Sequence, residues 1–257
     1  MVREYGCDGL PDDRVDVWYG LCGDSPVPDR QEARWSILSA DEWERCERFA
    51  RDRDRRQFAA ARVLVRRVLS RYAAVEPEAW EFAYSSLGKP SIAPRFGLSD
   101  LRFNAAHTRD LVACAVARWD DVGVDAECLD HEPGPLVARH SLSEEEMARY
   151  EQLRPIEQNR YFFRHWTLKE AYAKARGLGL SLPFPHISFT VTSNCGAVVA
   201  DESASPSEPA SWQFFHTLVT PRHCLAVAVR RPAHRETRFL VSRWQPWDGG
   251  GEPHCDG

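Results

Sequence analysis

Long apolar segments are absent from this sequence. No run reaches the roughly 18 consecutive apolar residues that a membrane-spanning helix needs, so we expect no membrane partner. The opening residues MVREYGCDGL also lack the apolar core of a secretory signal, which favours a cytoplasmic location. A surplus of basic residues is missing too, because the net charge is −5 at pH 7. We therefore expect no nucleic-acid partner.

Paired cysteine motifs are equally absent. The chain has eight cysteines, but they form no CxxC pair and do not combine with histidines at the spacing of a zinc site. Cys114 and Cys224 lie in apolar runs, where a free cysteine packs as a small hydrophobic side chain. We predict that the cysteines stay reduced and bind no metal.

The sequence does contain enough apolar material for a sizeable core. Its 257 residues include nine tryptophans and 11% aromatic residues, which indicates a globular protein of one large domain or two smaller ones. An internal repeat favours two halves. Residues 38–42 (LSADE) return as residues 142–146 (LSEEE), 104 positions later, and residues 111–116 resemble residues 224–229. The repeat predicts an α+β fold of two similar lobes related by pseudo-twofold symmetry.

The lobes are expected to meet near residue 121. We predict an N-terminal lobe over residues 1–121 and a C-terminal lobe over residues 122–257, with a ligand cleft between them. Residues 201–211 are polar and predict a loop, and the glycine-rich tail from about residue 248 to 257 is predicted to be disordered. Apolar patterns predict strands near residues 15–19, 81–85, 101–107, 111–118, 122–128 and 186–192, and helices near residues 39–51, 54–72 and 164–183.

The predicted helix at residues 164–183 places acidic and basic side chains on neighbouring turns. Trp166, Glu170 and Lys174 recur every four residues, so they lie along one face of the helix. Gly177 is a natural residue for its carboxyl end. Taken alone, Glu170 and Lys174 favour an exposed salt bridge between adjacent turns over a functional pair.

A second acidic site follows an apolar strand. Asp125 and Glu127 share one face of that strand, and two carboxylates at this spacing can converge on Mg²⁺, which prefers oxygen ligands. The alternative is an ordinary solvent-facing strand edge. Glu170 would supply a third carboxylate. Lys169 and Lys174 would then serve as phosphate contacts, since a metal–phosphate site needs positive charge beside the metal.

Two further motifs are weak alone. His107 ends a predicted strand, where a lone histidine is more often structural than functional, and residues 88–90 (Gly-Lys-Pro) indicate only a turn. In combination, however, the motifs are specific. Gly-Lys-Pro, Phe-Asn-x-x-His (103–107), Gly-Val-Asp-x-Glu (123–127) and Trp-x-x-Lys-Glu-x-x-x-Lys (166–174) follow one another in an order and spacing that resembles the Sfp-type 4′-phosphopantetheinyl transferases. The resemblance covers about residues 15–229.

This resemblance implies a two-lobed monomer that uses coenzyme A to activate apo carrier protein domains of peptide, polyketide and fatty-acid synthases. It implies that three carboxylates bind Mg²⁺, namely those of Asp125, Glu127 and Glu170. It also implies contacts with coenzyme A: Lys169 and Lys174 at the pyrophosphate, His107 at the 3′-phosphate, and Lys89 and Pro90 beside the adenosine.

An arginine of the long first-lobe helix is expected to reach a phosphate of coenzyme A as well. Arg62 is the better match and Arg56 the next. The chain departs from the family pattern at Ala106, where a serine usually precedes the histidine. Because that hydroxyl is missing, we expect weaker nucleotide contact at this point without loss of activity.

The implied reaction moves the 4′-phosphopantetheine arm to a serine hydroxyl of the carrier protein, and adenosine 3′,5′-bisphosphate leaves. Glu170 is the candidate base and Glu127 the second candidate, because serine needs a proton acceptor at neutral pH. Lys174 would stabilise charge on the pyrophosphate. Two alternatives stay open: a Mg²⁺-dependent nucleotide phosphohydrolase, and a regulatory protein that binds coenzyme A without transfer. The presence of all three acidic positions argues against the regulatory protein.

Overall fold

The computed structural model describes residues 9–245 with gaps at 24, 193–194, 202–210 and 233. Most of the predicted loop at 201–211 and the whole predicted tail at 248–257 therefore lie outside the described residues. No helix in the described ranges combines the length and apolarity that crossing a bilayer requires.

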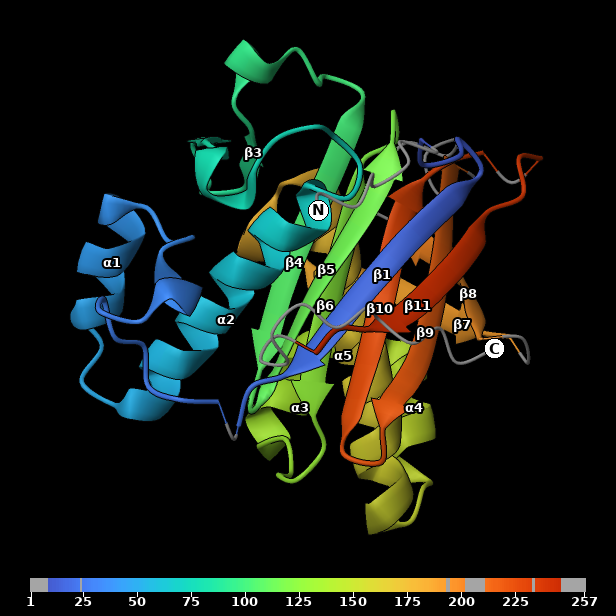
Figure 1. Cartoon of the computed structure of the whole chain (residues 1–257). Coiled ribbons are helices and arrows are strands. Elements are labelled where there is room, and N and C mark those ends of the chain that lie inside the picture. The colour runs from blue at the N-terminus through green and yellow to red at the C-terminus, as the bar shows by residue number, and fades with distance from the viewer. Residues whose placement is uncertain (1–8, 24, 193–194, 202–210, 233, 246–257) are drawn as a thin grey trace.

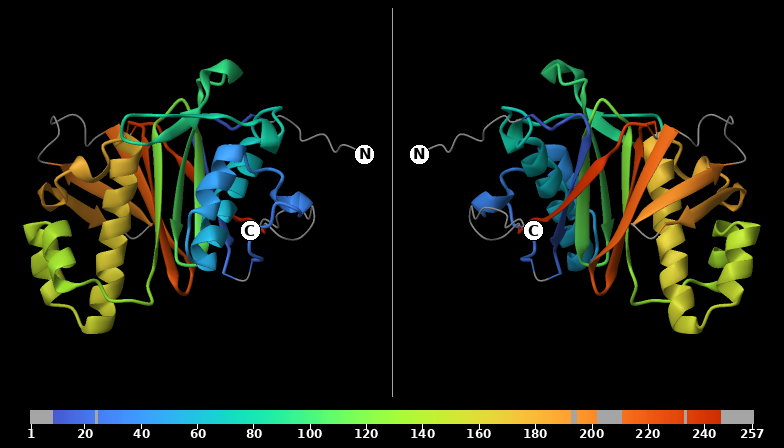
Figure 2. Two further views of the ribbon diagram at one scale, coloured as in Figure 1. Left: turned by 90° about the vertical axis from the view of Figure 1, so that its left-hand side faces the viewer. Right: turned by 90° about the vertical axis from the view of Figure 1, so that its right-hand side faces the viewer.

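Two sheets pack face to face between two long helices (Figures 1 and 2). The first sheet has the order β11-β1-β5-β4, and the second has the order β6-β10-β9-β8-β7. The strands are β1 (Arg14–Leu21), β4 (Leu101–Thr108), β5 (Leu111–Arg118), β6 (Val122–Cys128), β7 (Ile187–Val191), β8 (Gly196–Asp201), β9 (Trp212–Thr220), β10 (His223–Arg230) and β11 (Arg238–Arg243), with β2 (Phe82–Tyr84) and β3 (Pro90–Ile92) in a separate hairpin. The helices are α1 (Ala40–Glu47), α2 (Asp52–Leu69), α3 (Pro135–Ser141), α4 (Glu144–Glu151) and α5 (Pro155–Arg176), joined by short 3₁₀ turns at Ala33–Trp35, Pro77–Ala79, Pro94–Phe96, Gly179–Ser181 and Phe184–His186.

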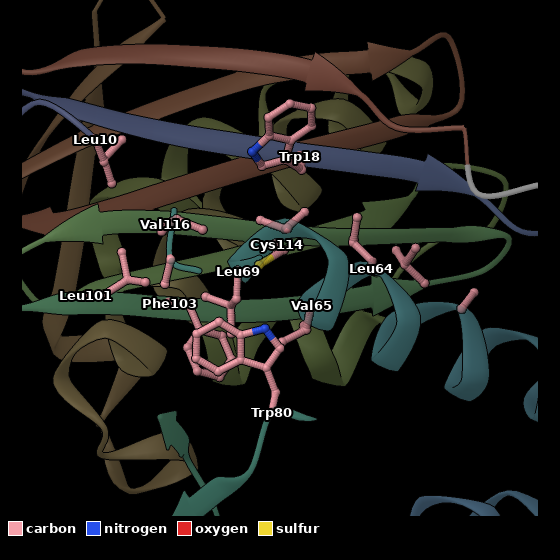
Figure 3. Close-up of a cluster of buried hydrophobic side chains, with 14 of the residues drawn as sticks. Leu10, Trp18, Leu64, Val65, Leu69, Trp80, Leu101, Phe103, Cys114 and Val116 are labelled. Atoms are coloured by element: carbon pink, nitrogen blue, oxygen red, sulfur yellow. The ribbon is translucent and has the colours of Figure 1, made fainter. Parts of the chain in front are cut away.

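Each layer is held by apolar side chains of complementary size. Alanines of β5 and valines of β6 and β10 fill the space between the sheets, so the two sheets approach closely. On the outer face of the first sheet, α2 packs through residues that include Leu64, Val65 and Leu69 (Figure 3). On the outer face of the second sheet, α5 packs through Leu168 and Tyr172. The predicted α+β fold is confirmed.

The predicted pseudo-symmetry appears in the caps of the short helices. Ser39 and Ser143 each begin a helix with a reciprocal capping box, in which the glutamate three residues later bonds back to the serine backbone. Glu42 and Glu146, the two capping glutamates, each also accept a hydrogen bond from a buried cation of the long helix in the same lobe. The sequence repeat therefore corresponds to a repeated set of contacts.

The buried cations complete the correspondence. Arg66 of α2 donates to the carbonyl of Trp80 at 2.8 Å. Lys169 of α5 donates to the carbonyl of Phe184 at 3.0 Å. Positions 80 and 184 are again 104 residues apart. In each lobe, the buried cation thus connects the long helix by a hydrogen bond to the segment just before the next strand.

The last described strand crosses between the lobes. β11 belongs to the predicted C-terminal lobe but lies parallel to β1 in the first sheet, with Val15 opposite Phe239. Just before it, Arg231 is fully buried and donates from Nε to Asp120 at 2.9 Å. A strand from the end of the chain is therefore part of the sheet of the first lobe. The predicted lobe boundary at residue 121 stays a prediction.

A seam between the edge strands β4 and β6 joins the two sheets on the other side. It is made by side chains of β4 that accept from backbone N–H groups of β6. Asn104 Oδ1 accepts from Val124 at 2.9 Å, and Thr108 Oγ1 accepts from Cys128 at 3.1 Å. Buried donors without a partner are costly, so these two bonds fix the relative register of the strands.

Candidate active site

The position of α5 against β6 depends on a glycine. A Cβ atom at Gly123 would lie 2.1 Å from the carbonyl oxygen of Ala171 and 2.4 Å from the backbone nitrogen of Ala175. No other residue type leaves room for the helix at this distance. Because α5 lies directly on β6, its side chains at Glu170 and Lys174 reach the same region as the carboxylates of the strand.

Asp125 pairs with Lys174 at the centre of this region. Lys174 Nζ donates to Asp125 Oδ1 at 2.6 Å. Asp125 is only 6% exposed, and its Oδ2 atom is buried without a hydrogen-bond partner in the described part of the chain. Burial raises the pKa of Asp125, and the charge of Lys174 opposes that shift. The structure therefore joins Lys174 to the strand carboxylate.

Glu127 is held at both oxygen atoms. The indole of Trp166 donates to Oε1 at 3.0 Å, and the hydroxyl of Thr108 donates to Oε2 at 3.2 Å. Burial and the charge of Asp125 raise the pKa of Glu127 to about 7, against the effect of the two donors. Trp166 was predicted only as part of a motif, and Thr108 was not predicted as a site residue.

Glu170 is the least constrained of the three acidic side chains. Within the described residues it accepts no hydrogen bond from a side chain, and it is half-buried. Burial first and the charge of Asp125 second raise its pKa, while Lys174 acts in the opposite direction. A partly exposed carboxylate with a raised pKa is suited to accept a proton near neutral pH.

The three carboxylates fit Mg²⁺ by chemistry, although no three acidic, histidine or cysteine side chains of the described chain converge on one ion position. All three have raised pKa values, first because burial removes water from their charged forms, and for Glu127 and Glu170 also because of the charge of Asp125; a bound cation would offset both effects. Asp125 also presents a buried oxygen that has no hydrogen-bond partner in the parts of the chain that the structure describes. Carboxylate oxygens are ligands that Mg²⁺ prefers, so the donor set matches the implied metal.

His107 ends β4 on the side of α2. Gln57 Nε2 lies 2.9 Å from His107 Nδ1, a contact that the sequence did not predict. His107 is an exposed residue, yet the protein around it removes part of the water near its imidazole. This loss of solvation, together with the charges of Lys174 and Arg62, lowers its pKa. The charge of Asp125 acts in the opposite direction and raises its pKa.

Arg62 and Arg56 have different surroundings. The guanidinium of Arg62 lies 5.3 Å from the centre of the Phe58 ring, its Nε lies 3.8 Å from Glu42 Oε1, and its charge acts on the pKa of His107. The charge of Arg56 acts instead on Cys22, whose pKa burial raises to about 12.

A cleft of about 390 Å³ lies between the lobes at the carboxyl end of α5. Lys89 and Pro90 of the Gly-Lys-Pro turn line it, together with Arg102 and Asp121. Lys89 Nζ donates to the carbonyl of Ala175 at 2.8 Å, one of the carbonyls that a helix end leaves without an intrahelical partner. The turn of the first lobe is thereby attached to the helix that carries Glu170 and Lys174.

The contacts of Lys169 contradict its predicted contact with the pyrophosphate. Its side chain is 0% exposed, and its ammonium group donates to Glu146 Oε2 at 2.5 Å, to the Ser141 carbonyl at 2.6 Å and to the Phe184 carbonyl at 3.0 Å. All three protons are used, so Lys169 is a structural residue of the second lobe.

Comparisons with known proteins agree with the motifs. Residues 121–228 match the model of the 4′-phosphopantetheinyl transferase superfamily, and residues 25–118 match that of a 4′-phosphopantetheinyl transferase N-terminal region. The chain is 38% identical over 177 residues to the 4′-phosphopantetheinyl transferase HetI of Nostoc, covering 67% of this chain and 72% of that protein. It is 30% identical over 226 residues to Sfp of Bacillus subtilis, covering 87% and 96%.

Among solved structures, a holo-(acyl-carrier-protein) synthase of Bacillus anthracis in complex with coenzyme A matches 44% of this chain and 96% of that chain, with 17% identity and a TM-score of 0.36. That similarity is too low to support an argument. The family models together cover most of the chain, and the relatives are similar over most of their length. The chain belongs to the 4′-phosphopantetheinyl transferase superfamily and is an enzyme of the Sfp type.

Proposed function

We propose that this transferase moves the 4′-phosphopantetheine arm of coenzyme A to a serine hydroxyl of an apo carrier protein, depends on Mg²⁺ and releases adenosine 3′,5′-bisphosphate. The observation that supports this most is the cluster at the β4–β6 seam. There, among the described residues, Asp125 presents an oxygen without a hydrogen-bond partner, Lys174 supplies positive charge, and Glu170 presents a carboxylate that accepts from no side chain.

Glu170 is the proposed base. It takes the proton of the serine hydroxyl while the serine oxygen forms a bond to the phosphorus that carries pantetheine. The bond from that phosphorus to the bridging oxygen breaks, and the electron pair leaves with adenosine 3′,5′-bisphosphate. Glu127 is less suited to this role because both of its oxygens already accept hydrogen bonds, from Trp166 and Thr108.

Lys174 is proposed to stabilise negative charge on the pyrophosphate as the bridging oxygen leaves. Its side chain is 30% exposed, so a phosphate oxygen can approach it. Mg²⁺, held by Asp125, Glu127 and Glu170, would polarise the phosphoryl oxygens and neutralise charge on the pyrophosphate. Fixed charges in a partly buried site cost little reorganisation when the charge develops.

The first lobe is proposed to bind the donor. His107 and Arg62 would contact the 3′-phosphate, and Lys89 and Pro90 would lie beside the adenosine in the cleft between the lobes. Because one chain supplies both the donor-binding side chains and the acidic side chains, a second copy is not needed to complete the site. This supports a monomer.

Carrier labelling tests the proposal directly. The protein is incubated with coenzyme A, Mg²⁺ and apo carrier proteins of peptide-, polyketide- and fatty-acid-synthase type, and the carriers are weighed as intact proteins. At least one carrier should gain one phosphopantetheine arm, and a carrier whose acceptor serine is replaced by alanine should gain none. Free 4′-phosphopantetheine without carrier labelling would support the phosphohydrolase instead. No labelling of any carrier type would contradict the proposed acceptors.

A further inference from the structure

A hydrogen bond between α2 and the end of β4 connects two residues that are 50 positions apart in the chain. Gln57 Nε2 lies 2.9 Å from His107 Nδ1. Gln57 belongs to none of the motifs by which the family was identified from the sequence. Its contact is with the ring that the proposed function places at the donor.

This contact selects one tautomer of the imidazole. An amide N–H can only donate, so Nδ1 of His107 must accept, and the single proton of the neutral ring then lies on Nε2. A histidine without such a partner divides its proton between the two nitrogens. The Gln57 amide therefore leaves Nε2–H as the donor that His107 offers to a ligand.

The backbone that carries Gln57 is firmly held. The next residues of α2, Phe58 and Ala59, are buried. Two guanidinium groups lie over the ring of Phe58, with Arg45 at 5.4 Å and Arg62 at 5.3 Å from the ring centre. The charge of Arg62 also acts on His107, so this cation accompanies the neutral glutamine and the neutral histidine, an arrangement suited to a phosphate dianion.

We infer that Gln57 is a positioning residue for donor recognition, which holds His107 with Nε2–H directed at the 3′-phosphate of coenzyme A. This inference rests on the proposed function, since it needs the donor phosphate at His107. Ala106 provides no hydroxyl beside the histidine, so the orientation of the ring carries more of the selectivity. Gln57 does not reach the acidic cluster, and its loss should change donor affinity without changing turnover.

Gln57→Met is the decisive variant, because methionine keeps the length and the helix propensity of glutamine and removes the hydrogen bond. Gln57→Glu reverses the contact, since a carboxylate draws the proton to Nδ1. His107→Ala removes the ring. Gln158→Met is the matched control, a glutamine of α5 whose Nε2 donates to the carbonyl of Tyr150 at 3.1 Å.

Each variant is assayed with coenzyme A and with dephospho-coenzyme A, which lacks the 3′-phosphate. Gln57→Met should raise KM for coenzyme A about fivefold, equivalent to ~1 kcal/mol for one hydrogen bond, and leave kcat and KM for dephospho-coenzyme A unchanged. Gln57→Glu should raise KM for coenzyme A further. In a His107→Ala background, Gln57→Met should add no further loss, because the two residues act as one unit.

Nitrogen-15 NMR of the imidazole gives a readout that a merely structural role would not change. The wild-type spectrum should show His107 protonated at Nε2 at neutral pH, and Gln57→Met should show a mixture of tautomers. Unchanged donor preference and an unchanged tautomer in Gln57→Met, with preference lost in His107→Ala, would overturn the inference and leave the proposed function intact. If His107→Ala keeps the preference for coenzyme A over dephospho-coenzyme A, the 3′-phosphate is bound elsewhere. The inference then fails together with the proposed contact of His107. The transfer reaction is tested separately by carrier labelling.

Discussion

Lys174→Met tests whether Lys174 neutralises the buried carboxylate of Asp125. The substitution keeps a side chain of similar length and removes the ammonium that lies 2.6 Å from Asp125 Oδ1. Asp125 is 6% exposed, and its second oxygen has no hydrogen-bond partner in the described structure. The variant therefore leaves a buried carboxylate without the cation that the structure places beside it.

The expected cost follows from the burial of the two partners. Removing one partner of a fully buried ion pair costs about 3–5 kcal/mol. The side chain of Lys174 is 30% exposed, so solvent screens part of this interaction. We expect a loss of about 2–3 kcal/mol in the free energy of unfolding at neutral pH, which corresponds to a fall in Tm of roughly 5–10 °C for a protein of this size.

The loss should depend on pH in a defined direction. Burial already raises the pKa of Asp125 above its value in the unfolded chain, and removal of Lys174 raises it further. A carboxyl group with a raised pKa in the folded state destabilises the protein above that pKa and does not do so once it is protonated. The difference from wild type should thus be largest at about pH 7.5 and should shrink towards about pH 5.

Thermal and urea denaturation, each with and without Mg²⁺, measure these effects. Mg²⁺ should raise the Tm of Lys174→Met more than that of wild type, because the ion then supplies the charge that Asp125 lacks. Lys89→Met is the matched control, since Lys89 donates to the carbonyl of Ala175 and should show no such gain. Equal stabilities of Lys174→Met and wild type at both pH values, with equal responses to Mg²⁺, would refute the reasoning.

Three further predictions concern the same region. Glu170→Gln should reduce kcat severely while coenzyme A still binds in calorimetry with saturating Mg²⁺, and turnover within about twofold of wild type, or ~0.4 kcal/mol in the barrier, would exclude Glu170 as the base. Trp166→Phe removes a donor to Glu127, so the pKa of that carboxyl should rise above about 7 and the acid limb of the pH–rate profile should move to higher pH; an unmoved limb would show that Glu127 does not set it. Gly123→Ala should lower stability by about 1–3 kcal/mol and reduce activity because α5 must shift. The control Gly134→Ala, whose added Cβ would meet only a Val137 methyl at 3.8 Å, should change neither, and equal behaviour of the two variants would contradict the packing argument.

Elements with a strong local pattern were predicted well. The bounds of β5 and β6 match the predicted ranges, and both copies of the short sequence repeat begin a helix, at Ser39 and at Ser143. The helix expected from residue 164 begins nine residues earlier at Pro155, since proline suits the first helical position. It ends at Arg176, where Gly177 adopts the left-handed conformation with φ 69°. β11 was not predicted, because its burial comes from pairing with a strand more than 200 residues away.

The site residues also differ in whether local spacing could predict them. Spacing on one element was sufficient to group Glu170 with Lys174. It failed for Lys169, since one residue along an α-helix turns the side chain by about 100°, here into the core instead of the site. Thr108 and Gln57 could not be found from local spacing either. Each meets its partner across two elements, so only the packing of the lobes brings them together.

The two lobes use corresponding strands for different purposes. β1 pairs with β5 in the first sheet as β6 pairs with β10 in the second, so β1 and β6 are counterparts. On the face of β1 that meets α2, Trp18 is buried in the apolar core and donates to the hydroxyl of Tyr72 at 2.9 Å (Figure 3). On the face of β6 that meets α5, Gly123 brings the helix close and Asp125 takes the position facing it. The acidic residue on that face of β1, Asp16, accepts from the hydroxyl of Tyr72 at 2.7 Å, whereas Asp125 of β6 pairs with Lys174 of α5. The first lobe instead contributes His107 and Thr108 from its edge strand, so the seam between unlike halves is where donor binding and acidic groups can meet.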